Sequence, residues 1–122
     1  MGPIGVSFLI PAYNEAATIG EVLERIDALD LESQIVVVDD GSTDATASIV
    51  EAFAAGRPHV ELLRQSNRGK GSAVRLAATR ITQDIAVIQD ADMEYDPADV
   101  LTLIAPIERG VADVVYGSRL SG

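Results

Sequence analysis

Residues 85–94 read Ile-Ala-Val-Ile-Gln-Asp-Ala-Asp-Met-Glu, an apolar run followed by an acidic turn. The apolar part predicts a short buried strand. Asp90 and Asp92 cannot both point into a core, because burying unpaired charge costs too much free energy. Their oxygens suit Mg²⁺ or Mn²⁺, ions that keep coordination positions open for substrate phosphates. On spacing alone, however, the Asp-x-Asp pair fits a solvated turn better than a metal site.

The composition limits the classes of function. With 122 residues the chain is long enough for one domain with a hydrophobic core. Its formal net charge of -10 argues against a nucleic-acid-binding protein, which needs a basic surface. An anionic ligand would need a cation or local N–H groups to offset the repulsion. The absence of cysteine excludes disulfides, zinc-thiolate sites and thiol catalysis.

The single histidine, His59, lies beside Pro58 in a predicted loop and is expected to be an ordinary surface residue. No Gly-x-Ser-x-Gly elbow of a hydrolase is present. No run approaches the roughly 20 apolar residues of a membrane span, and the N-terminus lacks the positive region of a signal peptide. We therefore expect a soluble cytoplasmic protein.

Predicted strands and helices alternate along the chain. Short apolar runs predict strands at 6–10, 35–38, 60–63, 85–88 and 113–116, the first of them ended by Pro11. Amphipathic spacing predicts helices at 18–29 with a Thr18 capping box, from Thr43 or Asp44 to before Gly56, at 72–80, and from Asp96-Pro97 to about 107. The alternation predicts an α/β domain with a mostly parallel sheet and helices on both faces.

Polar clusters follow four of these strands. They are Tyr13-Asn14-Glu15, Asp39-Asp40, 67–71 and 90–94. In a parallel sheet all four lie at the carboxyl edge, where ligands of α/β proteins bind. Lys70 and the amides around Gly69 and Gly71 are placed to meet anionic oxygens near a helix start. Neither a Walker loop nor a dinucleotide fingerprint is present, so the residues alone predict metal-dependent nucleotide or phosphate binding.

Five motifs together resemble a known family. Ile-Pro-Ala-Tyr-Asn-Glu (10–15), Val-Asp-Asp-Gly-Ser (38–42), Asn-Arg-Gly-Lys-Gly (67–71), Asp-Ala-Asp (90–92) and Gly-Ser-Arg (117–119) occur in the order found in family 2 inverting glycosyltransferases of GT-A fold. The match covers essentially the whole chain. Asp-Ala-Asp-x-Glu followed by Asp96-Pro97 is most similar to the dolichyl- or polyprenyl-phosphate mannosyl- and glucosyltransferases. The resemblance implies a Rossmann-like nucleotide-binding half.

The resemblance also implies residue roles. Pro11, Tyr13 and Glu15 would line the nucleoside pocket, and Asp39 would bind the base with Val37 beside it. Asp90, with Ala91 beside it, would lie near the ribose and phosphates, Asp92 would ligate Mg²⁺ or Mn²⁺, and Glu94 would be a further metal ligand. Arg119 would bind phosphate, and Asp90, Asp92 and Arg119 would be the catalytic group. Asp40 would brace its turn or touch the ligand, and Lys70 would bind the donor or be a solvated loop residue.

The implied reaction moves a sugar, with inversion, from a GDP- or UDP-sugar to a polyprenyl or dolichyl phosphate, or to a glycan acceptor. A phosphate acceptor is already ionised near pH 7, whereas a hydroxyl acceptor would need a general base. In the full-length protein the resemblance places this reaction at the inner face of the membrane, as a step in cell-envelope glycan synthesis. An unpaired edge at the fifth strand would favour a homo-oligomer.

Two alternatives remain open from the sequence. Relatives continue past Gly-Ser-Arg, so residues 1–122 are expected to form a truncated nucleotide-sugar-binding domain that transfers little sugar by itself, or a non-catalytic nucleotide-binding module. A more distant alternative is a phosphoacceptor receiver domain. In that fold the acidic pair follows the first strand and a lysine follows the last, whereas here Asp39-Asp40 follow the second and Lys70 precedes the fourth.

Overall fold

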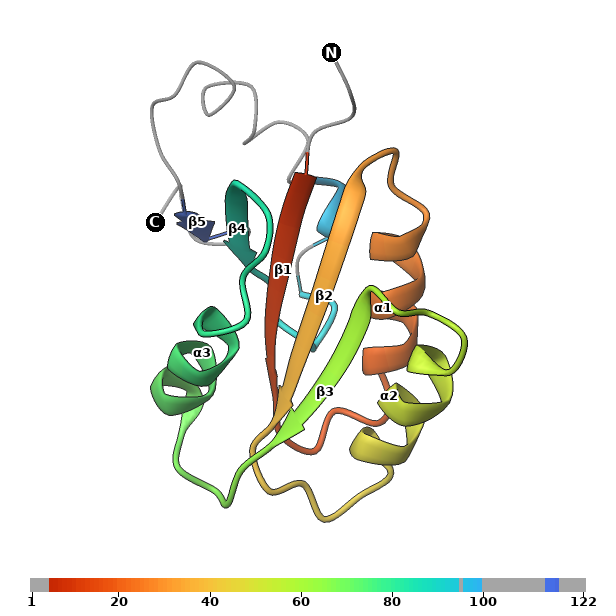
Figure 1. Cartoon of the computed structure of the whole chain (residues 1–122). Coiled ribbons are helices and arrows are strands. Elements are labelled where there is room, and N and C mark those ends of the chain that lie inside the picture. Colours follow the sequence, from red (N-terminus) through yellow and green to blue (C-terminus); the bar gives the residue numbers. More distant parts are fainter. Residues whose placement is uncertain (1–4, 95, 100–113, 117–122) are drawn as a thin grey trace.

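A five-stranded parallel sheet forms the centre of the protein in a computed structural model that describes residues 5–94, 96–99 and 114–116 (Figure 1). The strand order is β3-β2-β1-β4-β5, and every neighbouring pair is parallel. The strands are β1 (Gly5–Ala12), β2 (Glu32–Asp39), β3 (Val60–Arg64), β4 (Ile85–Ile88) and β5 (Val114–Tyr116). The predicted parallel sheet and its five strand positions are confirmed.

Helices cover both faces of the sheet, as predicted. Helices α1 (Ile19–Asp27) and α2 (Thr46–Ala54) lie on one face, and α3 (Lys70–Ala78) lies on the other (Figure 1). A short 3₁₀ turn, η1 (Pro97–Asp99), follows β4. The Asp96 carboxylate accepts the N–H of Ala98 at 2.9 Å, in keeping with the predicted cap, but the rest of the predicted fourth helix lies outside the described residues.

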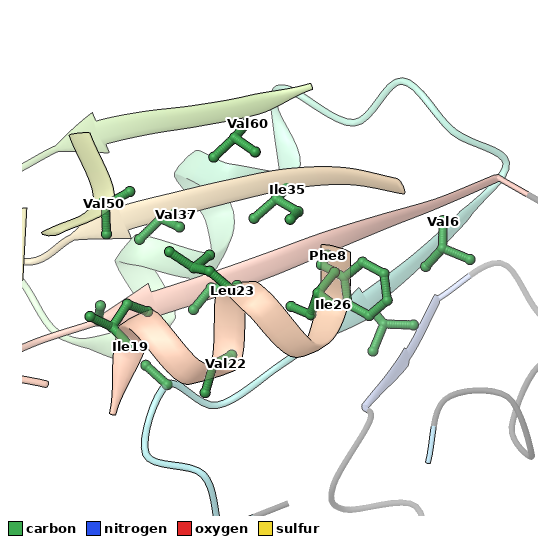
Figure 2. Packing of buried hydrophobic residues seen from close by; sticks show 14 of the residues in the cluster. Val6, Phe8, Ile19, Val22, Leu23, Ile26, Ile35, Val37, Val50 and Val60 are labelled. Carbon is green, nitrogen blue, oxygen red and sulfur yellow. The ribbon is translucent and has the colours of Figure 1, made fainter. Parts of the chain in front are cut away.

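The hydrophobic core has two layers because β1 and β2 are buried on both faces. Toward α1 and α2, Phe8, Ile35 and Val37 pack against Leu23 and Ile26 (Figure 2). Toward α3, the apolar strand side chains pack against alanines of the helix; the buried members are Leu9, Val36, Val38, Ala73, Ala77, Ala86 and Ile88. Continuous apolar strands are the expected result of covering both faces.

The end of the first strand differs from the prediction, and β2 begins three residues earlier than predicted. Pro11 was expected to end the first strand, but β1 continues to Ala12 with Pro11 opposite Val38. The carbonyl of Ala12 accepts a bond from the β2 side, and that of Leu9 accepts one from the β4 side. Successive residues of a strand direct their backbone N–H and C=O groups to opposite neighbouring strands. The N–H that Pro11 lacks would therefore point toward β4, which has already ended at Ile88. Proline therefore leaves no ladder bond unmade.

The strand order excludes the receiver-domain alternative. A receiver domain has the order 2-1-3-4-5, whereas this sheet has the order 3-2-1-4-5 of a Rossmann-type half. The chain winds outward from β1 to β3 and then crosses to β4 on the other side of β1. The connections reverse between β1 and β4, and such a switch point opens a crevice at the carboxyl ends of the two strands.

No helix in the described part of the chain is long and apolar enough to cross a membrane.

Candidate functional site

A cleft of about 290 Å³ lies at the carboxyl ends of β1 and β4, at the switch point of the sheet. It brings together residues from four polar segments of the chain. The lining residues are Pro11, Ala12, Tyr13, Glu15, Asp40, Lys70, Asp90, Ala91 and Asp92. The prediction that the polar clusters meet at one sheet edge is confirmed by this geometry.

One of the two aspartates at the cleft pairs with a lysine side chain. Nζ of Lys70 lies 2.6 Å from Oδ1 of Asp90, and the Asp90 side chain is only 12% exposed. Asp92 is exposed, and its Oδ1 accepts the N–H of Glu94 at 3.0 Å. This bond closes a tight turn in which Met93 has φ of 62°. Asp92 therefore uses one oxygen in the turn and lies exposed at the cleft, whereas Asp90 already has a cationic partner.

The loop after β1 is fastened to the loop after β2. The backbone N–H of Asn14 donates to Oγ of Ser42, and Oδ1 of Asn14 accepts the N–H of Thr43, both at 2.8 Å. The N–H of Glu15 donates to Oγ1 of Thr46 at 2.9 Å. These bonds hold Asn14 at φ of 52°, a conformation that asparagine adopts more readily than most residues. The segment that contributes Tyr13 and Glu15 to the cleft is therefore held by the loop after β2 and the first residue of α2.

Thr18 fastens the same loop to the acidic turn. It occupies the cap position of α1, as predicted, but its side chain makes no capping bond. Its hydroxyl donates instead to the carbonyl of Ala91 at 2.6 Å. The predicted capping box is therefore wrong in its hydrogen bond, because Thr18 has φ of -125° and ψ of -23° and not the extended backbone of a capping residue. The bond ties the start of α1 to the Asp-Ala-Asp segment.

Asp40 holds the loop that leads into α3. Its side chain accepts Nε2 of Gln65 at 2.8 Å and the N–H groups of Arg68 and Gly69 at 2.7 and 2.9 Å. Burial tends to raise the pKa of Asp40, but these three bonds outweigh it and hold the pKa below its ordinary value. Asp40 therefore braces the turn, and because the Gly69 N–H is used in this way it is not available to a ligand oxygen.

Not all predicted site residues reach the cleft. Pro11, Tyr13, Glu15, Lys70, Asp90, Ala91 and Asp92 line it. Val37 is fully buried in the core beneath α1, and Asp39 is 4% exposed with Oδ1 accepting the N–H of Ser42 at 3.3 Å. Glu94 is exposed but not a lining residue, and Arg119 lies outside the described residues. Ala12 and Asp40 join the lining, and the position of Asp40 directly after β2 was the available signal.

The donor set fits a metal ion that is shared with a phosphate ligand. No group of three or more His, Cys, Asp or Glu residues that could hold an ion occurs within the described residues. Mg²⁺ and related ions at phosphate sites need only one or two protein carboxylates, because substrate oxygens and water complete the shell. Asp92 and Asp90 at the cleft supply that number of carboxylates.

The fold and the site define a Rossmann-like α/β domain with an acidic cleft at its switch point. The sequence profile described as "Glycosyl transferase family 2" matches residues 7–122, so the chain belongs to glycosyl transferase family 2. An undecaprenyl-phosphate 4-deoxy-4-formamido-L-arabinose transferase of Pseudomonas fluorescens is 34% identical over 93% of this chain and 36% of its own length. The protein of that name from Shewanella sediminis is 34% identical over 89% of this chain and 35% of its own. The chain thus spans about a third of the length of these curated relatives.

Solved structures of glycosyltransferases share this fold. The mannosyltransferase PcManGT of Pyrobaculum calidifontis, in complex with GDP-Man and Mn²⁺, has a TM-score of 0.67 at 37% identity over 75% of this chain and 28% of its own. TarS of S. aureus, in complex with UDP-GlcNAc, has a TM-score of 0.73 and 27% identity, and the match covers 87% of this chain and 32% of TarS. Glucosyl-3-phosphoglycerate synthase of Mycobacterium tuberculosis, with Mn²⁺, UDP-glucose and phosphoglyceric acid, has a TM-score of 0.65 and 31% identity. That match covers 90% of this chain and 41% of the synthase. The GT-A fold expected from the sequence is confirmed.

Proposed function

We propose that this chain is the nucleotide-sugar-binding domain of a metal-dependent, inverting glycosyltransferase that uses a polyprenyl phosphate as acceptor. The observation that carries the proposal is the cleft at the switch point, which Asp90 and Asp92 line together with Tyr13 and Glu15 in a chain of this family. Both relatives described above are named for transfer to undecaprenyl phosphate. The three structural neighbours carry GDP- or UDP-sugars in their solved complexes.

The nucleoside of the donor would occupy the part of the cleft formed after β1. Pro11 and Tyr13 offer apolar and aromatic surface for it, and Tyr13 is 44% exposed, which leaves its ring accessible. We assign base recognition to Asp39, which does not line the cleft but lies opposite the lining residue Ala12 in the β1–β2 ladder, with fully buried Val37 supporting the end of β2. Its Oδ1 accepts the Ser42 N–H, so Oδ2 would accept from the base. An aspartate carboxylate pairs with a ring N–H of either uracil or guanine, so the donor class is a UDP- or GDP-sugar.

The diphosphate would lie between Asp92 and Lys70. Asp92 would hold Mn²⁺ or Mg²⁺ with Asp90 alongside it, and Glu94 and Arg119 keep their proposed roles as metal ligand and phosphate ligand. When bound, the ion supplies Lewis-acid stabilisation of charge on the departing nucleoside diphosphate. Lys70 at the start of α3 would exchange Asp90 for a phosphate oxygen, since a lysine can rotate between two anions at little cost.

The acceptor class follows from its chemistry and from the relatives. A polyprenyl phosphate is ionised near pH 7, so it attacks the anomeric carbon without a general base. Attack from the face opposite the departing diphosphate inverts that carbon. We propose that this reaction takes place at the inner face of a membrane, where a polyprenyl phosphate is anchored.

Calorimetric titration of the chain with UDP and GDP, with and without Mn²⁺, tests the donor site. Metal-dependent binding of one nucleotide is expected, with binding lost in Asp92→Asn. The matched control is Asp84→Asn, which makes the same change at an exposed aspartate just before β4, at the opposite end of that strand. Equal weakening by both variants, or binding that ignores the metal, would contradict the proposal.

A nucleotide-binding module without transferase activity is the second candidate, because the roles proposed for the cleft residues Tyr13, Lys70 and Asp92 concern the nucleotide and not the acceptor. The two candidates differ in turnover. Incubation with a radiolabelled UDP- or GDP-sugar and undecaprenyl phosphate would show labelled lipid for a transferase. Nucleotide binding with no labelled lipid would assign the module function to this chain.

A further inference from the structure

The positive charges of the chain are concentrated in one segment. Between residues 62 and 83 lie five of the nine lysines and arginines and none of the 19 acidic residues. The rest of the chain is correspondingly more acidic than the overall net charge of -10 indicates. The segment contains the end of β3, the loop braced by Asp40, and all of α3.

The fold places two of these charges on α3, which covers one face of the sheet (Figure 1). Helix α3 contains Lys70 and Arg75 and no acidic residue, whereas α1 on the opposite face contains Glu21, Glu24 and Asp27 (Figure 1). A groove of about 500 Å³ beside α3 collects three of the arginines. Its lining residues are Arg64, Gln65, Ser66, Arg68, Ser72, Arg75, Leu76 and Thr79, and we call it the basic groove.

Two arginines of the basic groove have guanidinium groups that form no ion pair with the residues that the structure describes. Arg64 pairs with Glu51 at 2.6 Å. In the part of the chain that the structure describes, the side chains of Arg68 and Arg75 form no ion pair, and the Arg68 guanidinium donates to Oγ of Ser66 at 3.3 Å. Both guanidinium groups belong to exposed residues. They offer donors to an anionic partner without first having to break a salt bridge.

The basic groove continues from the cleft. Lys70 is both the first residue of α3 and a lining residue of the cleft, and Ser72 and Arg75 follow it on the same helix into the groove. An anionic surface that contacts the groove would therefore lie next to the cleft. The acidic α1 would be turned away from that surface, because like charges repel over the Debye length of about 8 Å.

We propose that the basic groove docks the protein on a membrane surface that contains anionic phospholipid. The inference rests on the proposed function, which places the acceptor phosphate on a membrane lipid beside the cleft. Arg68 and Arg75 would bind lipid phosphates, since guanidinium matches phosphate oxygens in a bidentate manner. Docking would bring the cleft to the acceptor in a defined orientation without any membrane-spanning segment in the described residues.

Sedimentation with sucrose-loaded vesicles tests the docking. The chain should sediment with vesicles of phosphatidylcholine and phosphatidylglycerol, not with pure phosphatidylcholine, and added salt should release it. Arg68→Gln with Arg75→Gln should lower the partition coefficient by an order of magnitude or more, because each basic residue near an anionic surface contributes about fivefold. Arg25→Gln on α1 removes the same charge from an exposed arginine on the opposite face and should leave partitioning unchanged.

Several results would overturn the docking proposal. The first two are no sedimentation with anionic vesicles and equal loss in the Arg25 control. A third, arginine-dependent self-association by light scattering, would assign the groove to a second copy of this chain. Binding of a single-stranded RNA through Arg68 and Arg75 without vesicle binding would also overturn it. Nucleotide titration without lipid remains independent, so its success beside failed sedimentation would remove the docking inference and leave the donor site intact. Circular dichroism of each variant checks that the fold is kept.

Discussion

Nζ of Lys70 and Oδ1 of Asp90 lie 2.6 Å apart across the cleft, joining the start of α3 to the segment after β4. The Lys70 side chain is 51% exposed, so the pair contributes little to stability. Its importance is local, because it places an exposed ammonium group where the proposed diphosphate would lie. The ligand-free cleft thus offsets part of its negative charge with a group that a phosphate can attract.

Replacing Lys70 by Ala should separate phosphate recognition from nucleoside recognition. We expect UDP or GDP to bind about tenfold more weakly, because a hydrogen bond to a charged group contributes about 1.5 kcal/mol. Binding of the nucleoside alone should not change, and stability should change by less than about 0.5 kcal/mol. Titration with the diphosphate and with the nucleoside provides the measurement.

Lys70→Arg is the conservative control, since it keeps the charge on a side chain of similar reach. It should restore most of the diphosphate affinity. Equal loss of nucleoside and diphosphate binding in Lys70→Ala would instead mean that the residue shapes the loop and does not meet phosphate.

Asp40 should be far more important for stability than its position in a turn implies. Asp40→Ala leaves the Gln65 amide and the N–H groups of Arg68 and Gly69 without their acceptor at a residue that is 4% exposed. We expect a loss of about 3 kcal/mol in the free energy of unfolding, measured with urea. Asp30→Ala, at an exposed carboxylate between α1 and β2, is the control and should change stability by less than about 0.5 kcal/mol. Comparable losses in both variants would refute this role.

The same carboxylate predicts a pH dependence. Because hydrogen bonds hold the pKa of Asp40 below its ordinary value, the unfolded chain binds a proton more readily than the folded protein. Its contribution to stability is therefore complete above the ordinary aspartate pKa of about 4 and is lost as pH falls through the lowered folded value. Asp40→Asn should flatten the decline in stability below about pH 4. An unchanged slope in urea titrations across that range would contradict the assignment.

The strands could be predicted because each is a short apolar run, and their parallel arrangement followed from the intervening helices. An apolar run does not indicate which face of the sheet each side chain points to. In Ile35–Val38 every residue is apolar because both faces are covered, so no alternation showed that Val37 points into the core under α1. The sequence favours a strand end at Pro11, because it does not show that β4 lies beside β1. In the sheet β4 ends at Ile88, opposite Leu9, so no β4 residue lies opposite Pro11.

Hydrogen bonds between loops could not be predicted from the sequence either. A threonine three residues before a glutamate favours a capping box, and only the folded chain brings the carbonyl of Ala91 to Thr18. The same applies to Asp40, whose three donors come from residues 65–69. Local sequence rules describe the partners that a residue has nearby, whereas the candidate site is built from partners on other strands.

Thr18→Val tests whether the bond to Ala91 positions the acidic turn. The substitution keeps the shape of the side chain and removes the hydroxyl that donates at 2.6 Å. We expect a loss of about 1 kcal/mol in stability and weaker metal-dependent nucleotide binding, since the Asp-Ala-Asp segment would no longer be fastened to α1. Thr79→Val removes a hydroxyl bond of 2.7 Å to Leu76 at the end of α3 and should affect stability alone. Unchanged nucleotide affinity in Thr18→Val would show that the turn is held by other contacts.

Gly41 and Gly56 form a matched pair that separates backbone strain from a steric contact. Both have positive φ, of 79° and 77°. A Cβ at Gly41 would lie 2.9 Å from the backbone nitrogen of Asn67, whereas a Cβ at Gly56 would meet nothing within 4 Å. Gly56→Ala should therefore cost only the strain of a left-handed alanine, about 1 kcal/mol. Gly41→Ala should cost at least about 1 kcal/mol more, because two backbone segments must move apart.

The extra cost at Gly41 should also reach the cleft. Asn67 precedes Arg68, whose N–H is bound by Asp40, the residue before Gly41. Pushing the two loops apart would stretch that bond and shift the start of α3 with Lys70. Urea unfolding of both variants gives the stability difference, and nucleotide titration gives its effect on the site. Equal destabilisation by the two alanines would mean that the loops separate freely, and then the close approach of Gly41 to Asn67 would not hold Lys70 in the cleft.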